Sequence, residues 1–439
     1  MRLSLYRLFA ILGLAVAGIA NAQDHWVATW AASAQGARVA LPPAGRGGAT
    51  PAPAPAPAPS AAPTPAPANP GNQAAPAGFG PPPSFNNQTV RMIVRTSIGG
   101  RRVRVHLSNV FGTTPLRIGT VHIALRDKES AIFPASDRAV TFSGKPGFRI
   151  PPGAAIVSDP VDLEVPKLAD LAISVYVPEE AASPTSHATG LHTTYISKAG
   201  DFTAAPSISD PTARQSWYLL SEVDVLAPAD AGLIVAYGDS ITDGATSTPD
   251  KDQSWPSQLA QRLAADKATA NWAVVNQGIS GNRVLGDGAG VSALARFDRD
   301  VLSQPGVKWV IFLEGINDIG IASRGGDPVT ADDLIAAHKQ IIERAHMHGI
   351  KVMGATLTPY MGAAYYTEDG ETIRQALNQW IRTSNAYDAV VDFDKVTHDP
   401  DNVKQIRAAY NIRDHLHPND VGYKAMADAI DISIFTGRK

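Results

Sequence analysis

The hydrophobic pattern of this chain changes its period near Pro228, and this change constrains the fold more than any other feature. From Thr89 to about Val225, apolar and polar residues alternate and β-branched residues are frequent, which is typical of strands with one buried face. After Pro228, short apolar runs alternate with segments of helical length, which is typical of βαβ units. The sequence therefore predicts two domains, a β domain over 23–228 and an α/β domain over 229–439.

The β domain is predicted to be an antiparallel β-sandwich or jelly roll. Turn residues separate its strand candidates at short intervals, and no segment shows a convincing helical stripe. Gly99-Gly100 is predicted to be a hairpin turn between two of the strands. The strand candidates are 25–30, 90–96, 103–107, 116–124, 154–165, 171–177 and 217–225.

A low-complexity tract interrupts this domain. Residues 41–84 contain 15 of the 34 prolines, many alternating with alanine, and their only charge is Arg46, so the tract cannot form a packed core. Trp26 and Trp30 precede the tract in a strand-like run, and their large apolar side chains are expected to be buried in a core. We therefore interpret 41–84 as a long surface insertion within the β domain, the alternative being a flexible linker after a disordered N-terminus.

The first 22 residues have the pattern of an export signal. Arg2 and Arg7 precede an apolar run from Leu8 to Ala20, and Ala20-Asn21-Ala22 matches the small-x-small cleavage site. The alternative, a transmembrane anchor, needs about 20 apolar residues, and this run is shorter. We expect cleavage after Ala22, a periplasmic or extracellular location, and no stable membrane insertion after cleavage.

Composition excludes several classes of function. Lys and Arg total 38 against 41 Asp and Glu, and a net charge near −3 gives no electrostatic case for nucleic acid or an anionic membrane as partner. The chain has no cysteine, which excludes disulfides, thiolate metal sites, iron–sulfur clusters and a cysteine nucleophile. Any nucleophile must be another residue type.

The α/β domain is predicted to be a three-layer α/β/α sandwich around a parallel sheet, with right-handed crossovers. In such sheets, functional sites form at the carboxyl ends of the strands. The expected strands are 233–237, 274–276, 310–313, 352–356 and 390–393, and the expected helices are 255–267, 291–303, 330–348, 371–384 and 421–435.

A candidate nucleophile follows the first of these strands. Gly238-Asp239-Ser240 places a glycine-flanked serine at a strand-to-helix turn, where its hydroxyl can project from the sheet. Taken alone, the tripeptide fits a capping serine in a tight turn equally well.

Three further polar positions change this balance. Asp414 and His417 are three residues apart, so the carboxylate can orient the ring while the second ring nitrogen faces the serine. Gly281 follows the second strand and can present an unobstructed backbone N–H, and Asn317 follows the third strand and can donate its amide to the same oxyanion. Together these residues form an acyl-transfer site.

With these four blocks in place, residues 229–439 resemble the SGNH/GDSL hydrolase family, which has a flavodoxin-like fold. The resemblance implies Ser240 as nucleophile, His417 as general base with Asp414 as its partner, and an oxyanion hole of the Ser240 N–H, Gly281 and Asn317. Ile241 stands where the alternative family name has Leu, a common variant. The segments WVATWAAS, ARFDRDVL and EGINDIG also resemble an exported bacterial subgroup likened to acetylxylan esterases or arylesterases.

The remaining polar residues near these blocks have supporting roles in this interpretation. Asp239 and Asp318 are expected to accept hydrogen bonds from backbone N–H groups, and Arg283 to contact one of the site aspartates, with substrate as the alternative. His415, two residues before His417, has too few companion ligands for a metal site. We expect no metal and no organic cofactor.

The sequence therefore predicts an exported serine esterase that removes short acyl groups, in particular acetyl, from small-molecule or polysaccharide substrates. One alternative is a lipid-directed esterase, lysophospholipase or thioesterase with a tunnel for longer acyl chains. An alternative from another class is an inactive cell-surface protein whose β domain binds a glycan. The β domain itself is either a carbohydrate-binding module or a wall that helps shape the pocket.

Overall fold

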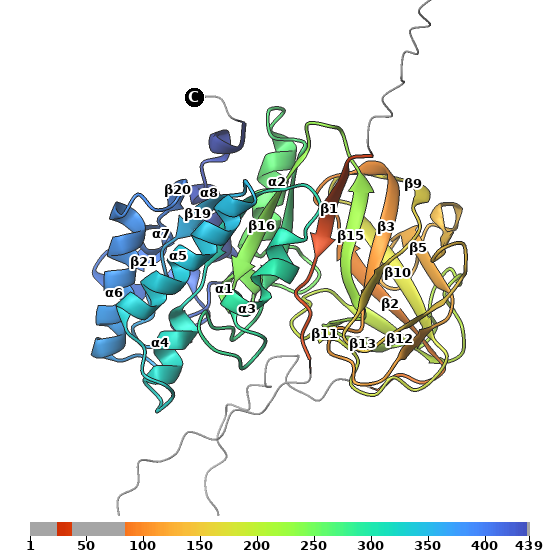
Figure 1. Ribbon diagram of the computed structural model, residues 1–439, viewed down its shortest axis with the longest axis horizontal. Coiled ribbons are helices and arrows are strands. Elements are labelled where there is room, and N and C mark those ends of the chain that lie inside the picture. The colour runs from red at the N-terminus through yellow and green to blue at the C-terminus, as the bar shows by residue number, and fades with distance from the viewer. Residues whose placement is uncertain (1–23, 37–83, 437–439) are drawn as a thin grey trace, which may run out of the picture.

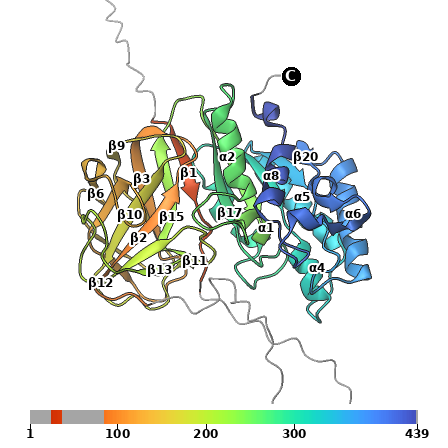
Figure 2. The ribbon, with the colours of Figure 1, turned by 180° about the vertical axis from the view of Figure 1, so that it is seen from behind.

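The computed structural model describes residues 24–36 and 84–436 of the chain (Figure 1). The predicted signal peptide 1–22, and the Pro/Ala tract 41–84 except Ser84, lie outside the described residues. The described chain forms a β-rich part and an α/β part that lie side by side (Figures 1 and 2). No helix in these two described ranges has the length and apolar character needed to cross a bilayer.

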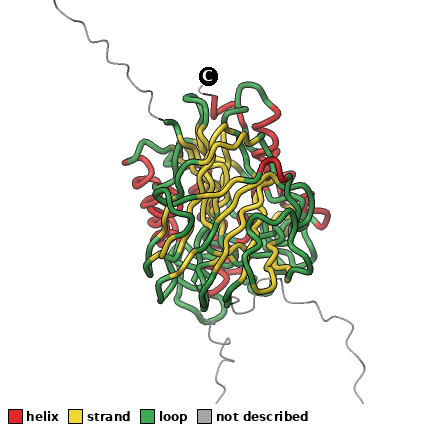
Figure 3. Tube along the Cα trace, turned by 90° about the vertical axis from the view of Figure 1, so that its right-hand side faces the viewer, coloured by secondary structure: helices red, strands yellow, loops and turns green. Residues whose placement is uncertain are grey.

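The β-rich part contains two main antiparallel sheets (Figure 3). Its strands are β1 (Trp26–Ala31), β2 (Gln88–Arg95), β3 (Gly100–Ser108), β4 (Leu116–Ile118), β5 (Val121–Leu125), β6 (Arg138–Val140), β7 (Phe148–Ile150), β8 (Ala155–Val157), β9 (Val161–Val165), β10 (Asp170–Val177), β11 (Ser186–His187), β12 (Thr194–Ala199), β13 (Thr212–Arg214), β14 (Trp217–Tyr218) and β15 (Leu220–Leu226). One sheet has the order β1-β15-β3-β8, with β9 also paired to β3, and the other has the order β13-β12-β2-β10-β5-β6. The predicted antiparallel, β-rich class is confirmed.

Alternating burial explains why the first sheet packs on one face. In β3, the side chains of Val103, Val105 and Leu107 are buried, while Arg104 and His106 between them are more exposed. The buried residues join the same apolar cluster as the inward residues of β2 and β10 in the other sheet. The two sheets therefore bury their apolar faces against each other, as the period-two pattern predicts.

The hairpin expected at Gly99-Gly100 is wrong. β2 pairs with β10 and β12, while β3 pairs with β15, β8 and β9, so the two glycines connect one sheet to the other. The crossing is tight, because a Cβ at Gly99 would lie 2.3 Å from the carbonyl oxygen of Val165. Glycine is required here by close backbone approach and not by a hairpin turn.

The α/β part contains one parallel sheet in the order β17-β16-β18-β19-β20. Its elements are β16 (Gly232–Gly238), α1 (Ser240–Asp243), α2 (Trp255–Ala265), β17 (Trp272–Gly278), α3 (Ala293–Phe297), β18 (Val307–Leu313), α4 (Ile316–Ala322), α5 (Ala331–Met347), β19 (Lys351–Ala355), α6 (Glu368–Thr383), β20 (Ala389–Val391), α7 (Phe393–Thr397), β21 (His398–Asp399), β22 (Asn402–Ile406) and α8 (Asp420–Ala429). In chain order the sheet reads 2-1-3-4-5, the flavodoxin-like arrangement, which confirms the predicted fold class.

Helices cover both faces of this sheet. α2 and α8 pack together on one face, and α3, α5 and α6 lie on the other (Figures 1 and 2). The helix expected over 291–303 is shorter, because α3 ends at Phe297 and a π-helical turn, Asp298–Leu302, follows it. The short helices α1, α4 and α7 have too few residues for a periodic pattern to reveal them.

Strand β1 joins the two parts. It lies at the edge of its sheet and packs beside β17, the edge strand of the parallel sheet. The N–H of Ala28 donates to the carbonyl of Pro305 at 3.1 Å, and the N–H of Val274 donates to Ser97 Oγ at 3.1 Å. Buried apolar residues of both parts belong to one continuous cluster. The β-sandwich therefore packs tightly against the α/β part.

Candidate active site

Ser240 begins helix α1 directly after the first parallel strand. β16 ends at Gly238, and Asp239 caps the helix by accepting a hydrogen bond from the N–H of Ile241 at 2.9 Å. Ser240 is only 6% exposed. A four-residue helix after a buried strand thus holds the hydroxyl at the carboxyl edge of the sheet.

Ser240, His417 and Asp414 form one hydrogen-bonded chain. Ser240 Oγ lies 2.9 Å from His417 Nε2, and His417 Nδ1 lies 2.6 Å from Asp414 Oδ2. Asp414 Oδ1 also accepts from the N–H groups of Leu416 and His417, each at 3.0 Å. These bonds fix the carboxylate, and the carboxylate orients the ring. The arrangement suits removal of a proton from Ser240.

The environment of Asp414 keeps it ionised. Partial burial on its own would raise its pKa, but the hydrogen bond from His417, the charge of His417 and the two backbone N–H groups outweigh burial. The pKa of Asp414 therefore lies below its ordinary value. A charged carboxylate at this position stabilises the imidazolium that forms when His417 accepts a proton.

Two backbone N–H groups beside Ser240 are available as donors. Gly281, in the turn after β17, has a φ of +82°, a backbone conformation that favours glycine. Within the described chain, no hydrogen bond occupies the N–H of Gly281 or of Ser240. Gly238 and Gly278 are in register as the last residues of their strands, so the two turns start side by side.

Asn317 lies in the first turn of α4, after the third strand of the sheet. Its Nδ2 donates to the carbonyl oxygen of Asn282 at 2.9 Å, which orients the amide and leaves one hydrogen of the same group to donate elsewhere. Asn282 directly follows Gly281 in the sequence. This bond therefore ties the Asn317 loop to the Gly281 turn, and both belong to the same edge as Ser240.

The aspartates near the site hold its loops through backbone N–H groups. Asp318 accepts from the N–H groups of Val284 and Leu285 at 2.8 and 3.0 Å, beyond the Gly281 turn. The predicted contact of Arg283 with an aspartate is not a direct ion pair. Arg283 instead donates to the carbonyl of Asp287. Burial raises the pKa of Asp318, and the charge of Arg283 offsets a small part of that rise.

Three buried carboxyl groups near the nucleophile have raised pKa values. Burial raises the pKa of Asp239 to about 7, and the hydrogen bond from Ile241 offsets part of the rise. Burial also raises the pKa of Asp318, and it raises that of Glu314 well above the usual range, with the charge of Asp239 adding to the rise at Glu314. Only Asp414, which is more exposed and paired with His417, has a lowered pKa within the site.

The sequence analysis missed the residues that connect the β-sandwich to this site. His187 Nε2 lies 2.9 Å from Asp243 Oδ1, and Asp243 Oδ2 accepts from the N–H and Oγ of Ser280. Arg296, only 1% exposed, donates to Ser33 Oγ at 2.8 Å. The position of Arg296 among apolar residues of α3, beside Ala293 and Phe297, is a sequence signal for a buried arginine. No local pattern identifies Ser33 or His187.

A cavity lies between the two parts, beside the triad and not at it. Trp30, Trp217 and His192 line it from the β-sandwich, and Asp243 and Thr248 line it from the α/β part. Its lining includes neither Ser240 nor His417. The cavity therefore reaches Asp243 at the end of α1, and its lining includes none of the site residues that the sequence predicts as catalytic or as oxyanion donors.

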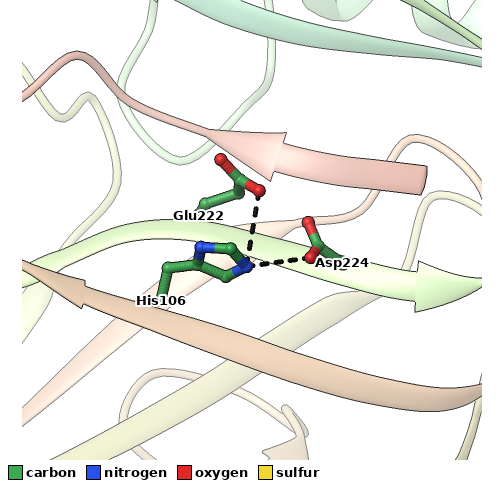
Figure 4. Close-up of side chains that lie close together, drawn as sticks. All are labelled: His106, Glu222 and Asp224. Atoms are coloured by element: carbon green, nitrogen blue, oxygen red, sulfur yellow. Dashed lines mark hydrogen bonds and ion pairs between the residues drawn. The ribbon is translucent and has the colours of Figure 1, made fainter. Parts of the chain in front are cut away.

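One group of potential metal ligands occurs among the described residues, and it lies in the β-sandwich (Figure 4). His106 Nε2 is 2.9 Å from Asp224 Oδ2 and 3.5 Å from Glu222 Oε1. Arg104 Nε lies 2.7 Å from Asp224, and burial with the charge of Asp224 raises the pKa of Glu222. The Arg104 guanidinium thus pairs with Asp224, and burial disfavours the charged form of Glu222.

His415 does not join His417 in a metal site. Its Nδ1 lies 3.1 Å from Gln405 Nε2, and its ring lies against Gly362. The side chain therefore contacts the loop after β19 and not the triad.

Comparison with known proteins finds a family model that matches the α/β part. Residues 236–425 match the model of the GDSL-like Lipase/Acylhydrolase family, and this segment includes Ser240, Gly281, Asn317, Asp414 and His417. Comparison with curated protein sequences finds no match.

Solved structures of GDSL proteins align with the same part of the chain. A G-D-S-L family protein from Desulfitobacterium hafniense is 28% identical over 45% of this chain and 96% of that one, with a TM-score of 0.34. A GDSL-like lipase from Bacteroides thetaiotaomicron is 22% identical over 47% and 89%, with a TM-score of 0.36. A catalytic mutant of an acetylxylan esterase from Geobacillus stearothermophilus is 21% identical over 47% and 95%, with a TM-score of 0.36.

The raised pKa of Asp239 predicts a specific pH dependence of stability. Its folded pKa of about 7 lies above the ordinary aspartate value of 3.8, so the contribution of Asp239 to stability is greatest at low pH and falls as pH rises from about 4 to 7. Asp239→Asn keeps the helix cap but cannot ionise. We expect the melting temperature of the variant, relative to wild type, to increase between pH 5 and pH 8. A difference that is constant across this range would show that Asp239 has an ordinary pKa.

Proposed function

We propose, on the premise that residues 236–425 belong to the GDSL-like lipase/acylhydrolase family and form a carboxylic ester hydrolase, that Ser240 is the nucleophile of a short-chain esterase. The observation that carries the proposal is the hydrogen-bonded chain from Ser240 through His417 to Asp414. It lies at the carboxyl edge of the parallel sheet, where three loops supply polar groups from successive strands.

The first half-reaction forms an acyl-serine. Ser240 Oγ attacks the ester carbonyl while His417 Nε2 accepts the hydroxyl proton, and Asp414 stabilises the resulting imidazolium. The carbonyl oxygen becomes negative in the tetrahedral intermediate. The N–H groups of Ser240 and Gly281 and the free amide hydrogen of Asn317 are the donors proposed for it. His417 then returns the proton to the leaving alcohol.

The second half-reaction releases the acyl group. His417 Nε2 accepts a proton from water as the water attacks the acyl-serine, and the same donors stabilise the second tetrahedral intermediate. Collapse of this intermediate frees the carboxylic acid and returns the proton to Ser240. Every proton transfer in this scheme uses the ring of His417, so the mechanism needs no group beyond the residues of the chain.

We further propose that the substrate is a short acyl ester, in particular an acetyl ester, of a carbohydrate. Its support is the resemblance of WVATWAAS, ARFDRDVL and EGINDIG to a subgroup likened to acetylxylan esterases. The export pattern of residues 1–22 supports a role outside the cytoplasm, in the periplasm or the medium. A lipid-directed esterase or thioesterase is the second candidate within the same chemistry.

The acyl preference is testable with a series of nitrophenyl esters from acetate to palmitate, together with acetylated xylan and acetylated monosaccharides. We expect the highest kcat/KM for acetate and measurable release of acetic acid from the acetylated sugars. A maximum at eight or more carbons would favour the lipid-directed candidate. Absence of hydrolysis on every ester would favour a glycan-binding protein instead.

Ser240→Ala should abolish hydrolysis without unfolding the protein. Serine and histidine act as a unit, so removing the hydroxyl should lower kcat by about 10⁶-fold or to background. A fluorophosphonate should label the wild type at Ser240 and leave the variant unlabelled. If a variant with an intact circular dichroism spectrum kept a tenth of wild-type activity, the nucleophile would be another residue.

Asn317→Ala tests the oxyanion hole separately from the triad. The amide is proposed to donate to an oxygen that is negative only in the transition state, so kcat should fall by about 10²–10³-fold while KM changes little. If Asn317 only ties its loop to Asn282, KM should rise and activity should fall in proportion to lost stability. Steady-state kinetics beside a melting curve distinguishes these outcomes, and a kcat within threefold of wild type would remove Asn317 from the proposed hole.

A further inference from the structure

We propose that Arg296 is a positioning residue that holds the three oxyanion donors in one arrangement, and that Ser33 of the β-sandwich completes its hydrogen bonds. This inference rests on the proposed function. It assigns the β-sandwich a role in catalysis, through the geometry of the oxyanion hole and without any contact with substrate.

Arg296 projects from α3 into the space between the two parts of the chain and uses its whole guanidinium group. Nε donates to Asn282 Oδ1 at 2.9 Å, and Nη2 donates to the carbonyl of Gly238 at 3.0 Å. Nη1 lies within 3.0 Å of three acceptors, which are Ser33 Oγ, the carbonyl of Gln277 and Asp300 Oδ2.

Three of these acceptors lie close in sequence to the proposed donors, at the ends of β16 and β17 or in the turn after β17. The carbonyl of Gly238 lies two residues before Ser240, and its position limits where the Ser240 N–H can point. The carbonyl of Gln277 and the side chain of Asn282 lie on either side of Gly281. One planar group therefore sets the distance between two turns that come from different strands.

The third donor is connected through the same residue. The carbonyl of Asn282 accepts from Asn317 Nδ2, while the side chain of Asn282 accepts from Arg296. A shift of Asn282 would move the Asn317 amide and the Gly281 N–H together. Arg296 is thus linked to all three donors, and its hydrogen bonds go to Asn282, Gly238, Gln277, Ser33 and Asp300 and not to Ser240 or His417.

Ser33 brings the β-sandwich into this network. Its Oγ accepts from Arg296 Nη1 at 2.8 Å and lies 2.7 Å from Gln277 Oε1, to which it can donate. Both Ser33 and Arg296 are almost completely buried, so water cannot replace either partner freely. A buried donor left without an acceptor costs about 1–3 kcal/mol, and the cost is higher for a charged group.

Three further groups lie beside the buried charge of Arg296, and one of them is Glu314, whose Oε2 is 3.8 Å from Nη2. Asp300 Oδ2 lies 3.0 Å away as a counter-ion, and the ring of Tyr237 lies 4.2 Å from the guanidinium carbon. Lysine cannot reproduce this arrangement, because its ammonium has three donors at one point and not five in a plane. Arg296→Lys therefore keeps the positive charge but cannot form the same set of planar hydrogen bonds.

A second chain of hydrogen bonds from the β-sandwich reaches the Gly281 turn through His187. His187 Nδ1 lies 2.9 Å from the carbonyl of Ser33, and its Nε2 lies 2.9 Å from Asp243 Oδ1. Asp243 Oδ2 in turn accepts from the N–H of Ser280, the residue before Gly281. Ser33 and His187 thus approach the Gly281 turn from the β-sandwich through separate hydrogen bonds.

Ser33→Ala tests the inference, with Ser97→Ala as a matched control. Both are buried serines of the β-sandwich that hydrogen-bond to β17, but Ser97 contacts Val274 in the strand, away from its carboxyl end. We expect Ser33→Ala to lower kcat roughly 3–10-fold with KM within twofold, and Ser97→Ala to leave kcat unchanged. Equal kcat values for the two variants would overturn the inference.

Arg296→Lys supplies the stronger test. We expect kcat to fall about 100-fold, comparable to the loss of one oxyanion donor, with the Ki of a boronic acid that forms a tetrahedral adduct at Ser240 rising in parallel. KM should change little, because the ground-state ester gains little from these donors. A general loosening of the fold would instead raise KM and lower the melting temperature together. If Arg296→Lys does not fold, the comparison of Ser33→Ala with Ser97→Ala still tests the inference.

The outcomes also separate this inference from the proposed function. If the wild type is active and neither Ser33→Ala nor a folded Arg296→Lys lowers kcat, the inference is overturned. The proposed esterase function is then retained. A wild type that hydrolyses no ester and is not labelled at Ser240 would overturn both. Loss of kcat in Arg296→Lys with unchanged KM and a weaker boronic acid adduct would support the positioning role.

Discussion

The apolar contact between β1 and β17 is the interaction on which the arrangement of the whole molecule depends. Each strand is the edge of its own sheet, and an exposed apolar edge is costly unless another element covers it. Val27 and Ala28 of β1 are fully buried, and the apolar cluster continues from the sandwich into the parallel sheet without a break. Because this contact fixes the two parts relative to each other, the segment after β1 must run along the carboxyl end of β17. Ser33 reaches the Gly281 turn for this reason.

This packing favours one of the two roles considered for the β-sandwich. A carbohydrate-binding module on a flexible connection would need few buried contacts with its enzyme, and its loss would leave the active site unchanged. Here buried polar groups of the sandwich form hydrogen bonds with the loops of the site, and each would be left unsatisfied by separation of the two parts. The sandwich is therefore better described as a wall of the hydrolase. Its own glycan binding, if present, would be an additional property.

The sequence predicted the layers of the fold because these depend on short-range patterns. It predicted the approach of His417 to Ser240, 177 positions away, from four local motifs taken together and from the family that they resemble. Ser240 follows an apolar run, and Asp414 and His417 are separated by three residues, so each signal is local. The failures have a physical cause as well. Gly99-Gly100 fits a hairpin locally, but burial of two apolar sheet faces placed the flanking strands in different sheets. The bond from Arg296 to Ser33 joins residues 263 positions apart, and no local pattern specifies such a contact.

The distribution of charge around Ser240 follows from which carboxyl groups are buried. Excess negative charge nearby would disfavour the proposed oxyanion. Asp239 and Asp318 nevertheless accept hydrogen bonds from backbone N–H groups of the site, and Asp414 orients His417. A fourth acidic side chain, Glu314, is buried 3.8 Å from Arg296. Burial raises the pKa values of Asp239, Asp318 and Glu314, so these groups retain their hydrogen-bonding atoms while carrying less charge than exposed carboxylates would. Asp414, partly exposed and bonded to His417, remains ionised where a negative charge is required. The depth of each carboxyl group thus separates Asp414, whose charge suits the proposed mechanism, from three carboxyl groups that would disfavour the proposed oxyanion if they were fully charged.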